Sequence, residues 1–407
     1  MAQISTRGDL IAALHEASEI EHGLLLQYLF AAFSLKQRPS EGVTTEQFAI
    51  LRQWKGILLS VAVDEMGHLG TVCNLLAAVG AAPHFSRPAF PQRNGYYPFP
   101  FELVPFSDEA LERFVTAELP VGGAIADCLK DPSLGPLSAF EALDLAPEVP
   151  AYNYVGELYG HIKQGIQAIP ESQLFIGTPP RQVDNNWSVN VDMRVVKDRV
   201  TALDAIDDIV RDGEGAPGGR FGSHYGKYCQ MWRTFRSSPF QAARPVARNP
   251  LTRSERQASG VPTTLISDHT SLAVAELFNL TYSLALQLLA QFFANAGESE
   301  VQRREIRLAS ARLMSTGVRP IAEVLTALPA STVGEDTAGP TFELYLPVVV
   351  PPEIANRWIL VFEAFDQIIA EATRLAAVSS DLSRLAAVAD TLSVMKRSLQ
   401  VAARSGS

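Results

Sequence analysis

The chain has few cysteines and no cluster of basic residues, and both absences restrict what it can do. Its three cysteines among 407 residues, Cys73, Cys128 and Cys229, each stand alone in their segments. This pattern predicts neither a disulfide framework nor a CxxC metal site, and it fits a protein of the reducing cytoplasm. The net charge is -10 and Lys and Arg form no run. The chain is therefore not expected to bind nucleic acid or a membrane, and a small-molecule partner is favoured.

A signal peptide and an uninterrupted apolar run are also missing. The N-terminus lacks the basic-then-apolar order of a signal peptide. The most apolar long segment, Leu272 to Ala296, contains Glu276, Asn279 and two glutamines. It is therefore expected to be a buried helix rather than a membrane span. Hydrophobic residues make up 47% of the chain and charged residues 19%, which is typical of a globular protein long enough for two domains.

Helical periodicity covers most of the chain and predicts an all-α fold. Long bundle helices are expected at residues 9–36, 46–79, 152–169 and 195–212. A crossover rich in proline and aromatic residues lies between the second of these helices and a short helix that begins after Ser107. The predicted domains are a four-helix bundle at residues 1–235, a linker at 236–262 and a second helical bundle at 263–407.

The strongest chemical signal is a carboxylate and an imidazole inside an apolar helix. Glu65 and His68 lie three residues apart, so both side chains point the same way. The flanking residues 57–63 and 71–78 are largely apolar and free of proline, and the pattern stops at Gly80. A buried carboxylate is costly unless it is paired or binds a metal. A Glu-x-x-His pair inside a bundle is the recurring half-site of di-iron and di-manganese carboxylate proteins.

Candidates for the other half of such a site occur on the remaining bundle helices. Glu21 is seven residues from both Leu14 and Tyr28 and so shares their apolar face, whereas Glu157 lies near the apolar stripe of the third helix. The fourth helix has no Glu-x-x-His. Glu214 and His224, on either side of a glycine-rich break, are expected to supply the missing ligands.

Each candidate also has an ordinary structural explanation. A single Glu-x-x-His is more often a surface pair or a hydrogen-bonded core histidine, and the partners on other helices are what favour a metal site. His161 forms an i,i+4 pair with Glu157 and is either a helix-surface contact or a further ligand. His22 points away from Glu21 and is expected to be structural.

Several strings spread over nearly the whole chain carry a family resemblance. They are Glu21-His22 with Tyr28-Leu29, Glu65 to Leu69, Asn74 to Gly80, Phe114 with Glu118 to Pro120, Gly156 to Tyr159, Leu174 to Gly177, Gly213 to Gly215, Ser223 to Tyr225 and Thr337 to Pro340. Together they resemble the bacterial ferritin-like family that includes the ferritin-like part of iminophenyl-pyruvate dimer synthase, a violacein-pathway enzyme. The resemblance implies a ferritin-like four-helix bundle with a long aromatic crossover, followed by a second helical bundle. It also places Glu21, Glu65, His68, Glu157, Glu214 and His224 at the family's acidic and histidine positions.

The leading functional hypothesis is a di-metal oxidoreductase of secondary metabolism. Two iron ions, with manganese as the alternative, would act with O2 or peroxide on a small, amino-acid-derived substrate. The rival readings are a non-catalytic metal-binding or scaffold protein with the same fold, and iron storage. For the half at residues 263–407, three roles stay open: covering the site, forming a homodimer interface, or binding substrate.

Overall fold

The computed structural model describes residues 4–93, 95–97, 99–120, 128, 155–177, 182–184, 191–213, 222–253, 261–294 and 297–405. Within these residues the protein is mostly helical. The first half contains α1 (Arg7–Ser34), η1 (Pro39–Glu41), α2 (Thr45–Ala78), α3 (Asp108–Ala117), α5 (Val155–Ala168), α6 (Glu171–Leu174), α7 (Arg199–Asp212) and α8 (His224–Ser237). The second half contains α9 (His269–Ala294), α10 (Glu300–Leu313), η4 (Met314–Val318), α11 (Arg319–Leu325), α12 (Ile354–Ala376), η5 (Ser380–Leu382) and α13 (Arg384–Arg404).

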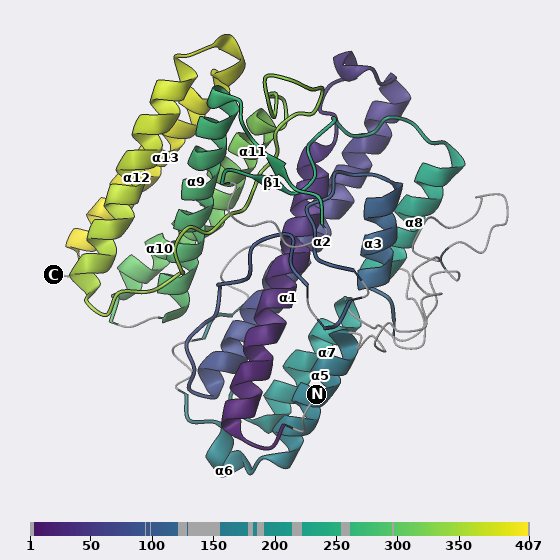
Figure 1. The fold of residues 1–407 in the computed structure, drawn as a ribbon. Helices are drawn as coiled ribbons and strands as arrows, with labels where there is room; N and C mark the ends of the chain where they lie inside the picture. The colour runs from purple at the N-terminus through teal and green to yellow at the C-terminus, as the bar shows by residue number, and fades with distance from the viewer. Residues whose placement is uncertain are drawn as a thin grey trace.

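The long helices α1 and α2 pack against each other and run through the middle of the molecule (Figure 1). Each begins with a capping box, at Thr6 and at Thr44. The threonine side chain accepts a hydrogen bond from the backbone amide three residues later, and the side chain of that later residue accepts one from the threonine amide. Helix α2 ends as its sequence predicts. Gly80 takes a positive φ of 85° and donates its amide to the Ala77 carbonyl, which closes the last turn.

The other two bundle positions are each divided between two shorter helices. Helix α3 packs against α8, and α5 packs against α7 (Figure 1). The α5–α7 pair lies toward one end of the α1–α2 pair and the α3–α8 pair toward the other. Between them the chain leaves helical geometry, after Ala117 in α3 and between Asp212 and His224. Both breaks therefore fall part-way along the central pair.

The aromatic crossover between α2 and α3 is packed into the core. Its aromatic side chains Phe85, Phe90, Tyr96, Tyr97, Phe99, Phe101 and Phe106 are all buried. One antiparallel bridge, between Gln92 and Phe101, is the only regular pairing recorded within the described part of this segment. The crossover thus covers the bundle with apolar surface rather than with a further helix.

The second half is the predicted helical bundle, and it packs against the first. Helices α9 to α13 gather on one side of α1 and α2 (Figure 1), and α11 touches α1. Buried apolar residues of both halves belong to one contiguous cluster. Between the halves, β1 (Pro250–Leu251) and β2 (Thr264–Leu265) pair in parallel. The domain limits 1–235, 236–262 and 263–407 stay a prediction.

One expectation from the sequence is wrong: two of the three cysteines form a disulfide bond. Cys128 is joined to Cys229 on α8, with their Cα atoms 5.3 Å apart, and Cys73 is free and buried. The two partners are 101 positions apart in the sequence, which gives no local signal for the pairing. Disulfide bonds are typical of oxidising compartments, so a cytoplasmic location stays a prediction.

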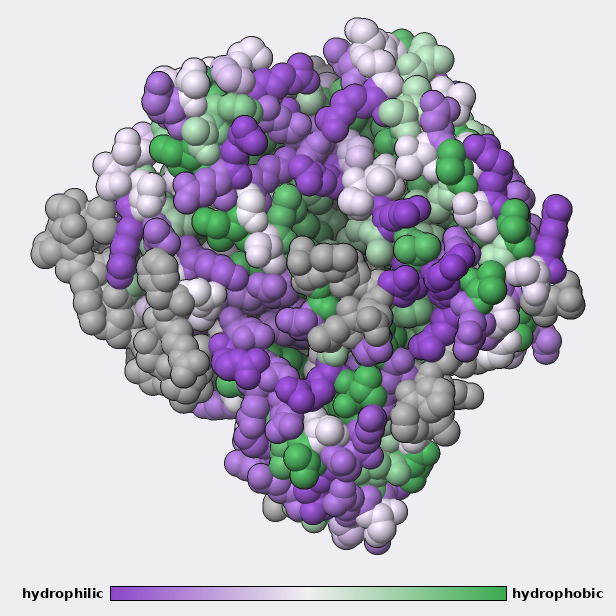
Figure 2. All heavy atoms as spheres, turned by 180° about the vertical axis from the view of Figure 1, so that it is seen from behind, coloured by the Kyte–Doolittle hydropathy of each residue, from purple (hydrophilic) through white to green (hydrophobic). Residues whose placement is uncertain are grey.

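Helices α2 and α9 are the two that are long and apolar enough to cross a membrane by length and composition. In each, 61% of the most apolar window is buried inside the protein, as in the core helix of a soluble protein. On the face shown in Figure 2, hydrophilic residues cover most of the surface and hydrophobic residues form only small, scattered groups. This face therefore offers no broad apolar patch.

A buried ion network ties the two halves together through Glu323 of α11. Its carboxylate accepts from Lys55 of α2 at 2.8 Å, from Arg319 at 2.9 Å and from Arg384 of α13 at 3.0 Å. Burial by itself would raise the pKa of Glu323. The three cations outweigh it and lower the pKa to about 2.

We predict that Glu323→Gln lowers the free energy of unfolding by about 2–3 kcal/mol at pH 7, because it leaves three cations without their carboxylate. Urea denaturation measures the loss. Since the pKa is lowered on folding, the stabilisation is complete above the usual value of 4.5 and fades as the pH falls toward 2. Glu371→Gln is the control, because it breaks only the i,i+3 pair with Arg374 on the surface. It should cost less than about 0.5 kcal/mol; an equal cost for both variants would contradict the prediction.

Candidate metal centre

Five buried side chains meet at the level of the two helix breaks. They form two groups, Glu21 with Glu65 and His68, and Glu65 with Glu118 and His224, in which one ligand atom from each residue lies within 4.8 Å of the others. Glu65 belongs to both groups. All five side chains are at most 7% exposed.

The two groups repeat one geometry on either side of Glu65. His68 Nδ1 lies 3.0 Å from Glu65 Oε2 and 3.5 Å from Glu21 Oε2. His224 Nδ1 lies 3.1 Å from Glu65 Oε1 and 3.5 Å from Glu118 Oε2. Each imidazole therefore faces one oxygen of the shared carboxylate and one oxygen of an outer carboxylate.

The helix ends explain how these groups come together. Glu21 and the Glu65–His68 pair project from the middle of α1 and α2, where all sides are covered. Glu118 is the C-cap of α3, and His224 is the first residue of α8, after the N-cap Ser223. Gly213, the C-cap of α7, lies so close that a Cβ there would be 3.1 Å from His224 Nδ1 and 3.2 Å from His68 Cε1. A glycine at this break leaves room for the cluster.

Without a bound ion, protons and imidazolium charges hold the cluster together. Burial raises the pKa of Glu21 to about 7 and also raises the pKa of Glu118. Burial would raise the pKa of Glu65 too, but His68 and His224 hold it well below its usual range. Against burial, Glu65 and Glu21 raise the pKa of His68 to about 10, and Glu118 and Glu65 raise that of His224.

The cluster has the chemistry of a metal site. Glu21 Oε2, Glu65 Oε1, Glu118 Oε2 and His224 Nδ1 are buried, and beyond the imidazole–carboxylate contacts of 3.1–3.5 Å inside the cluster they make no hydrogen bond among the described residues. Orphaned buried acceptors are costly, and a cation would satisfy them. Two positions with oxygen and nitrogen donors suit iron, manganese or zinc. Because Glu65 belongs to both groups, its carboxylate could serve an ion at either position.

A second layer of residues orients the candidate ligands. Asp64 Oδ2 lies 3.1 Å from Nε2 of His224 and is itself paired with Lys227 at 3.2 Å. Tyr159 donates a hydrogen bond to Glu21, and Tyr28 donates one to Glu118 at 2.5 Å. Such contacts fix the ring and carboxylate orientations and leave the facing atoms available.

The structure brings together four of the six residues singled out in the sequence. Glu21, Glu65, His68 and His224 all lie in the cluster. Glu157 does not: it is exposed on α5, because Leu158 and Tyr159 of that helix face the core instead. Glu157 therefore has to be withdrawn as the carboxylate of the third bundle position. Glu214 lies outside the described residues, and His161 belongs to neither group.

Glu118 is the residue that the sequence reasoning missed. It stands at the end of a ten-residue helix and was interpreted only as that helix's last turn. A signal was nevertheless present. Glu118 lies seven residues after Leu111 and four after Phe114, so it shares their apolar face. The same criterion identifies Glu21.

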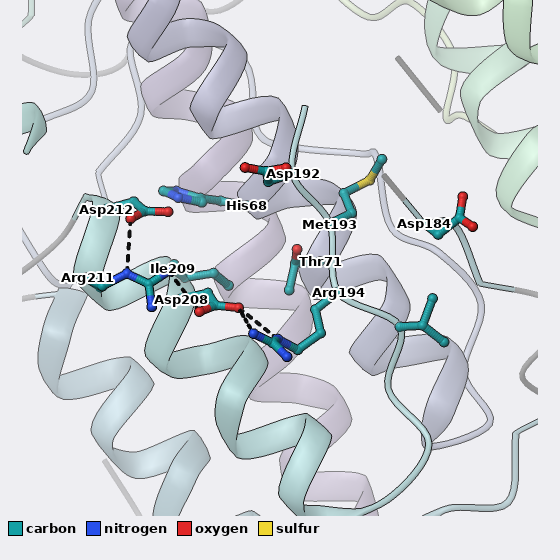
Figure 3. A pocket seen from close by; sticks show the side chains of 11 residues that line it. His68, Thr71, Asp184, Asp192, Met193, Arg194, Asp208, Ile209, Arg211 and Asp212 are labelled. Carbon is teal, nitrogen blue, oxygen red and sulfur yellow. Dashed lines mark hydrogen bonds and ion pairs between the residues drawn. The ribbon is translucent and has the colours of Figure 1, made fainter. Parts of the chain in front are cut away.

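An open cleft of about 660 Å³ reaches the cluster from the side of His68. Four aspartates and two arginines line it, together with His68, Thr71 and Met193 (Figure 3). Arg194 reaches Asp208 at 2.6 Å and Arg211 reaches Asp212 at 3.4 Å. The cleft is therefore polar and solvated, and His68 is the cluster residue that lines it.

A family model described as Ferritin-like matches residues 14–233. Dichlorochromopyrrolate synthase of Lentzea aerocolonigenes is 30% identical over 406 residues, with 88% of this chain and 38% of the relative covered. The 2-imino-3-(indol-3-yl)propanoate dimerase of Chromobacterium violaceum is 30% identical over 370 residues, with 83% and 34% covered. The chain thus spans little more than a third of these relatives' length.

Among solved structures, a ferritin-like protein from Caulobacter vibrioides superposes with a TM-score of 0.49 at 18% sequence identity. The superposition covers 79% of this chain and 96% of that one.

We predict that metal binding releases protons and tightens as the pH rises. Glu21 and His68, with pKa values of about 7 and 10, carry protons below these values that a metal ion must displace. The affinity for Mn²⁺, which is stable in this range, should therefore rise at least about tenfold per pH unit between pH 6 and 7. Calorimetry in two buffers of different ionisation enthalpy counts the protons. An affinity independent of pH, with no proton release, would contradict the assignment.

Proposed function

Because the chain belongs to the ferritin-like family, we propose that it is a two-metal oxidoreductase acting on a small, amino-acid-derived molecule. The family expectation drawn from the sequence is confirmed by the match over residues 14–233. The observation that carries the proposal is the pair of buried groups that share Glu65, each with two carboxylates and one imidazole.

The five cluster residues would hold the ions. Glu21 and His68 would bind at one position, Glu118 and His224 at the other, and Glu65 would serve both. Two bound iron ions, with manganese as the alternative, would supply the electrons that reduce O2 or peroxide. Both histidines use Nδ1, which leaves Nε2 of His224 to Asp64.

The protein's own residues prepare this centre in three ways. Tyr28 and Tyr159 hold the outer carboxylates by donating hydrogen bonds, so that their free oxygens face inward. Asp64 keeps the His224 ring in place. The buried crossover aromatics and the second helical half belong to the same apolar core, which keeps water away from the bundle interior and so strengthens charge interactions there.

The substrate class is proposed from the relatives and from the cleft. The name of the Chromobacterium violaceum relative describes an imino acid that carries an indole ring. An open, polar cleft beside His68 suits a small molecule with a charged end, which could reach the centre without unfolding the bundle. We place the reaction in secondary metabolism, as a proposal that rests on these relatives.

The test compares Glu118→Gln, which removes a proposed ligand, with the control Glu157→Gln. Glu157 is exposed in the structure, although the sequence predicts it as a ligand. After anaerobic Fe(II) loading and desalting, wild type and Glu157→Gln should each retain about two ions per chain, and Glu118→Gln about one or fewer. On exposure to air, the first two should consume O2 rapidly, and Glu118→Gln at least about tenfold more slowly.

Circular dichroism controls for folding, since Gln preserves the size of the side chain and the acceptor for Tyr28. Fewer than about one ion in the wild type would defeat the two-metal proposal. Equal metal retention by the two variants would remove Glu118 from the site. Metal binding without O2 consumption, with or without amino-acid-derived substrates, would favour a non-catalytic metal-binding protein instead.

A further inference from the structure

A second, enclosed cavity lies behind the metal cluster, between α1, α2 and α9. It is lined from α1 by His22, from α2 by Met66 and Leu69, and from α9 by Tyr282 and Leu286. His22, Met66 and Leu69 each directly follow a cluster residue in the chain, namely Glu21, Glu65 and His68. The cavity therefore adjoins the candidate metal centre along both central helices.

The walls of this cavity suit a neutral, apolar ligand. Among the described residues that line it, none is Asp, Glu, Lys or Arg. The polar side chains are His22 and Tyr282, and Nε2 of His22 is hydrogen-bonded to the Tyr282 hydroxyl at 2.6 Å. A charged group would lose its water here without meeting an opposite charge among these residues. Phe85 and Phe293, edge to face at 5.5 Å, add aromatic surface.

The cavity is small but has adaptable walls. Its volume is about 40 Å³, less than the roughly 150 Å³ of a cavity that holds benzene. Three of the chain's six methionines, Met66, Met193 and Met314, line it. Methionine side chains are unbranched and move readily between rotamers, so they can yield to a ring. Met314 opens the single π turn η4, a feature often found at functional sites.

Met193 separates this cavity from the open cleft, because it lines both. The segment that carries it lies directly on α2. At Gly70 of α2 the Met193 side chain occupies the place where a Cβ would stand, and at Gly67 the Asp192 carbonyl does the same. Moving Met193 would join the apolar cavity to the polar cleft beside His68 (Figure 3).

We propose that this cavity is the binding site for an aromatic ring of the substrate, with Met193 as a movable partition between ring and polar end. The proposal rests on the proposed function and names the part of the ligand that the site recognises. A molecule with an apolar ring and a charged end would place the ring behind Met193 and the charged end in the cleft beside His68.

The test uses 5-fluoroindole as the probe, followed by ¹⁹F NMR during titration of the full, metal-free chain. Leu286→Trp fills the cavity from α9, and Leu280→Trp makes the same change outside the lining, about 120° around that helix. We expect saturable binding by the wild type, a dissociation constant within about twofold for Leu280→Trp, and at least about tenfold weaker binding for Leu286→Trp. Thermal unfolding confirms that both variants are folded.

A second variant keeps the test decisive if Leu286→Trp fails to fold. Gly70→Ala adds one methyl group to the cavity wall, where the Met193 side chain now stands, and should weaken binding of the ring while α2 stays intact. The proposal is overturned if the wild type shows no saturable binding, if both tryptophan variants bind alike, or if the cavity takes xenon but no ring. Because the metal-free chain is used, loss of ring binding with intact metal loading refutes only this inference. Ring binding without metal loading refutes only the proposed function.

Discussion

The rest of this structure depends on burying three carboxylates, Glu21, Glu65 and Glu118, against one another inside an apolar bundle. Like charges in a low-dielectric interior repel strongly, and each carboxylate also loses its hydration. In the absence of an ion, protons on Glu21 and the charge on His68 offset part of this cost, which is why the pKa of Glu21 rises to about 7 and that of His68 to about 10. Cations at the two positions would replace those protons. The cluster thus has a physical reason to bind metal beyond its spacing.

The architecture around the cluster follows from this constraint. The long helices α1 and α2 supply ligands from mid-helix, where their backbones are already satisfied. The flanking positions supply theirs from helix ends, Glu118 after α3 and His224 at the start of α8. Because α3 ends and α8 begins at the same level, Glu118 enters the cluster from a helix C-terminus and His224 from a helix N-terminus. Gly213 has no side chain, so the end of α7 can lie close to both histidines. The same level opens outward into the polar cleft and, behind Met193, into the apolar cavity.

Most of the fold could be predicted from the sequence, because its signals are local. Helical periodicity and the glycine after α2 predict the bundle helices of the first half to within a few residues, and the helical character of the second half. The site was harder, because it depends on which face of a short helix turns inward. Glu157 and Tyr159 are two residues apart on α5, and the structure turns Tyr159, not Glu157, toward Glu21. Glu118 shares an apolar face with Phe114, but it stands at the end of a short helix just before Pro120, where a buried metal ligand is not expected.

Pairing between distant segments was beyond reach for a different reason. The sequence carries no local signal for the disulfide between Cys128 and Cys229. It also carries none for the hydrogen bond between His22 and Tyr282, which are 260 residues apart. Such contacts follow only from how the two helical halves pack. The apolar cavity lined by His22 and Tyr282 is likewise a product of both halves, which gives residues 263–407 a part in shaping the surroundings of the cluster.

The central claim is that Glu65 is shared by two metal positions, and a crystal structure of the Mn²⁺-loaded protein tests it most directly. Anomalous scattering should place one ion between Glu21, Glu65 and His68 and a second between Glu65, Glu118 and His224. Each ion should lie about 2.0–2.2 Å from its carboxylate and imidazole ligands, as metals of this size do. An anomalous map with no peak beside Glu65, or with its peaks bound to other residues, would contradict the claim.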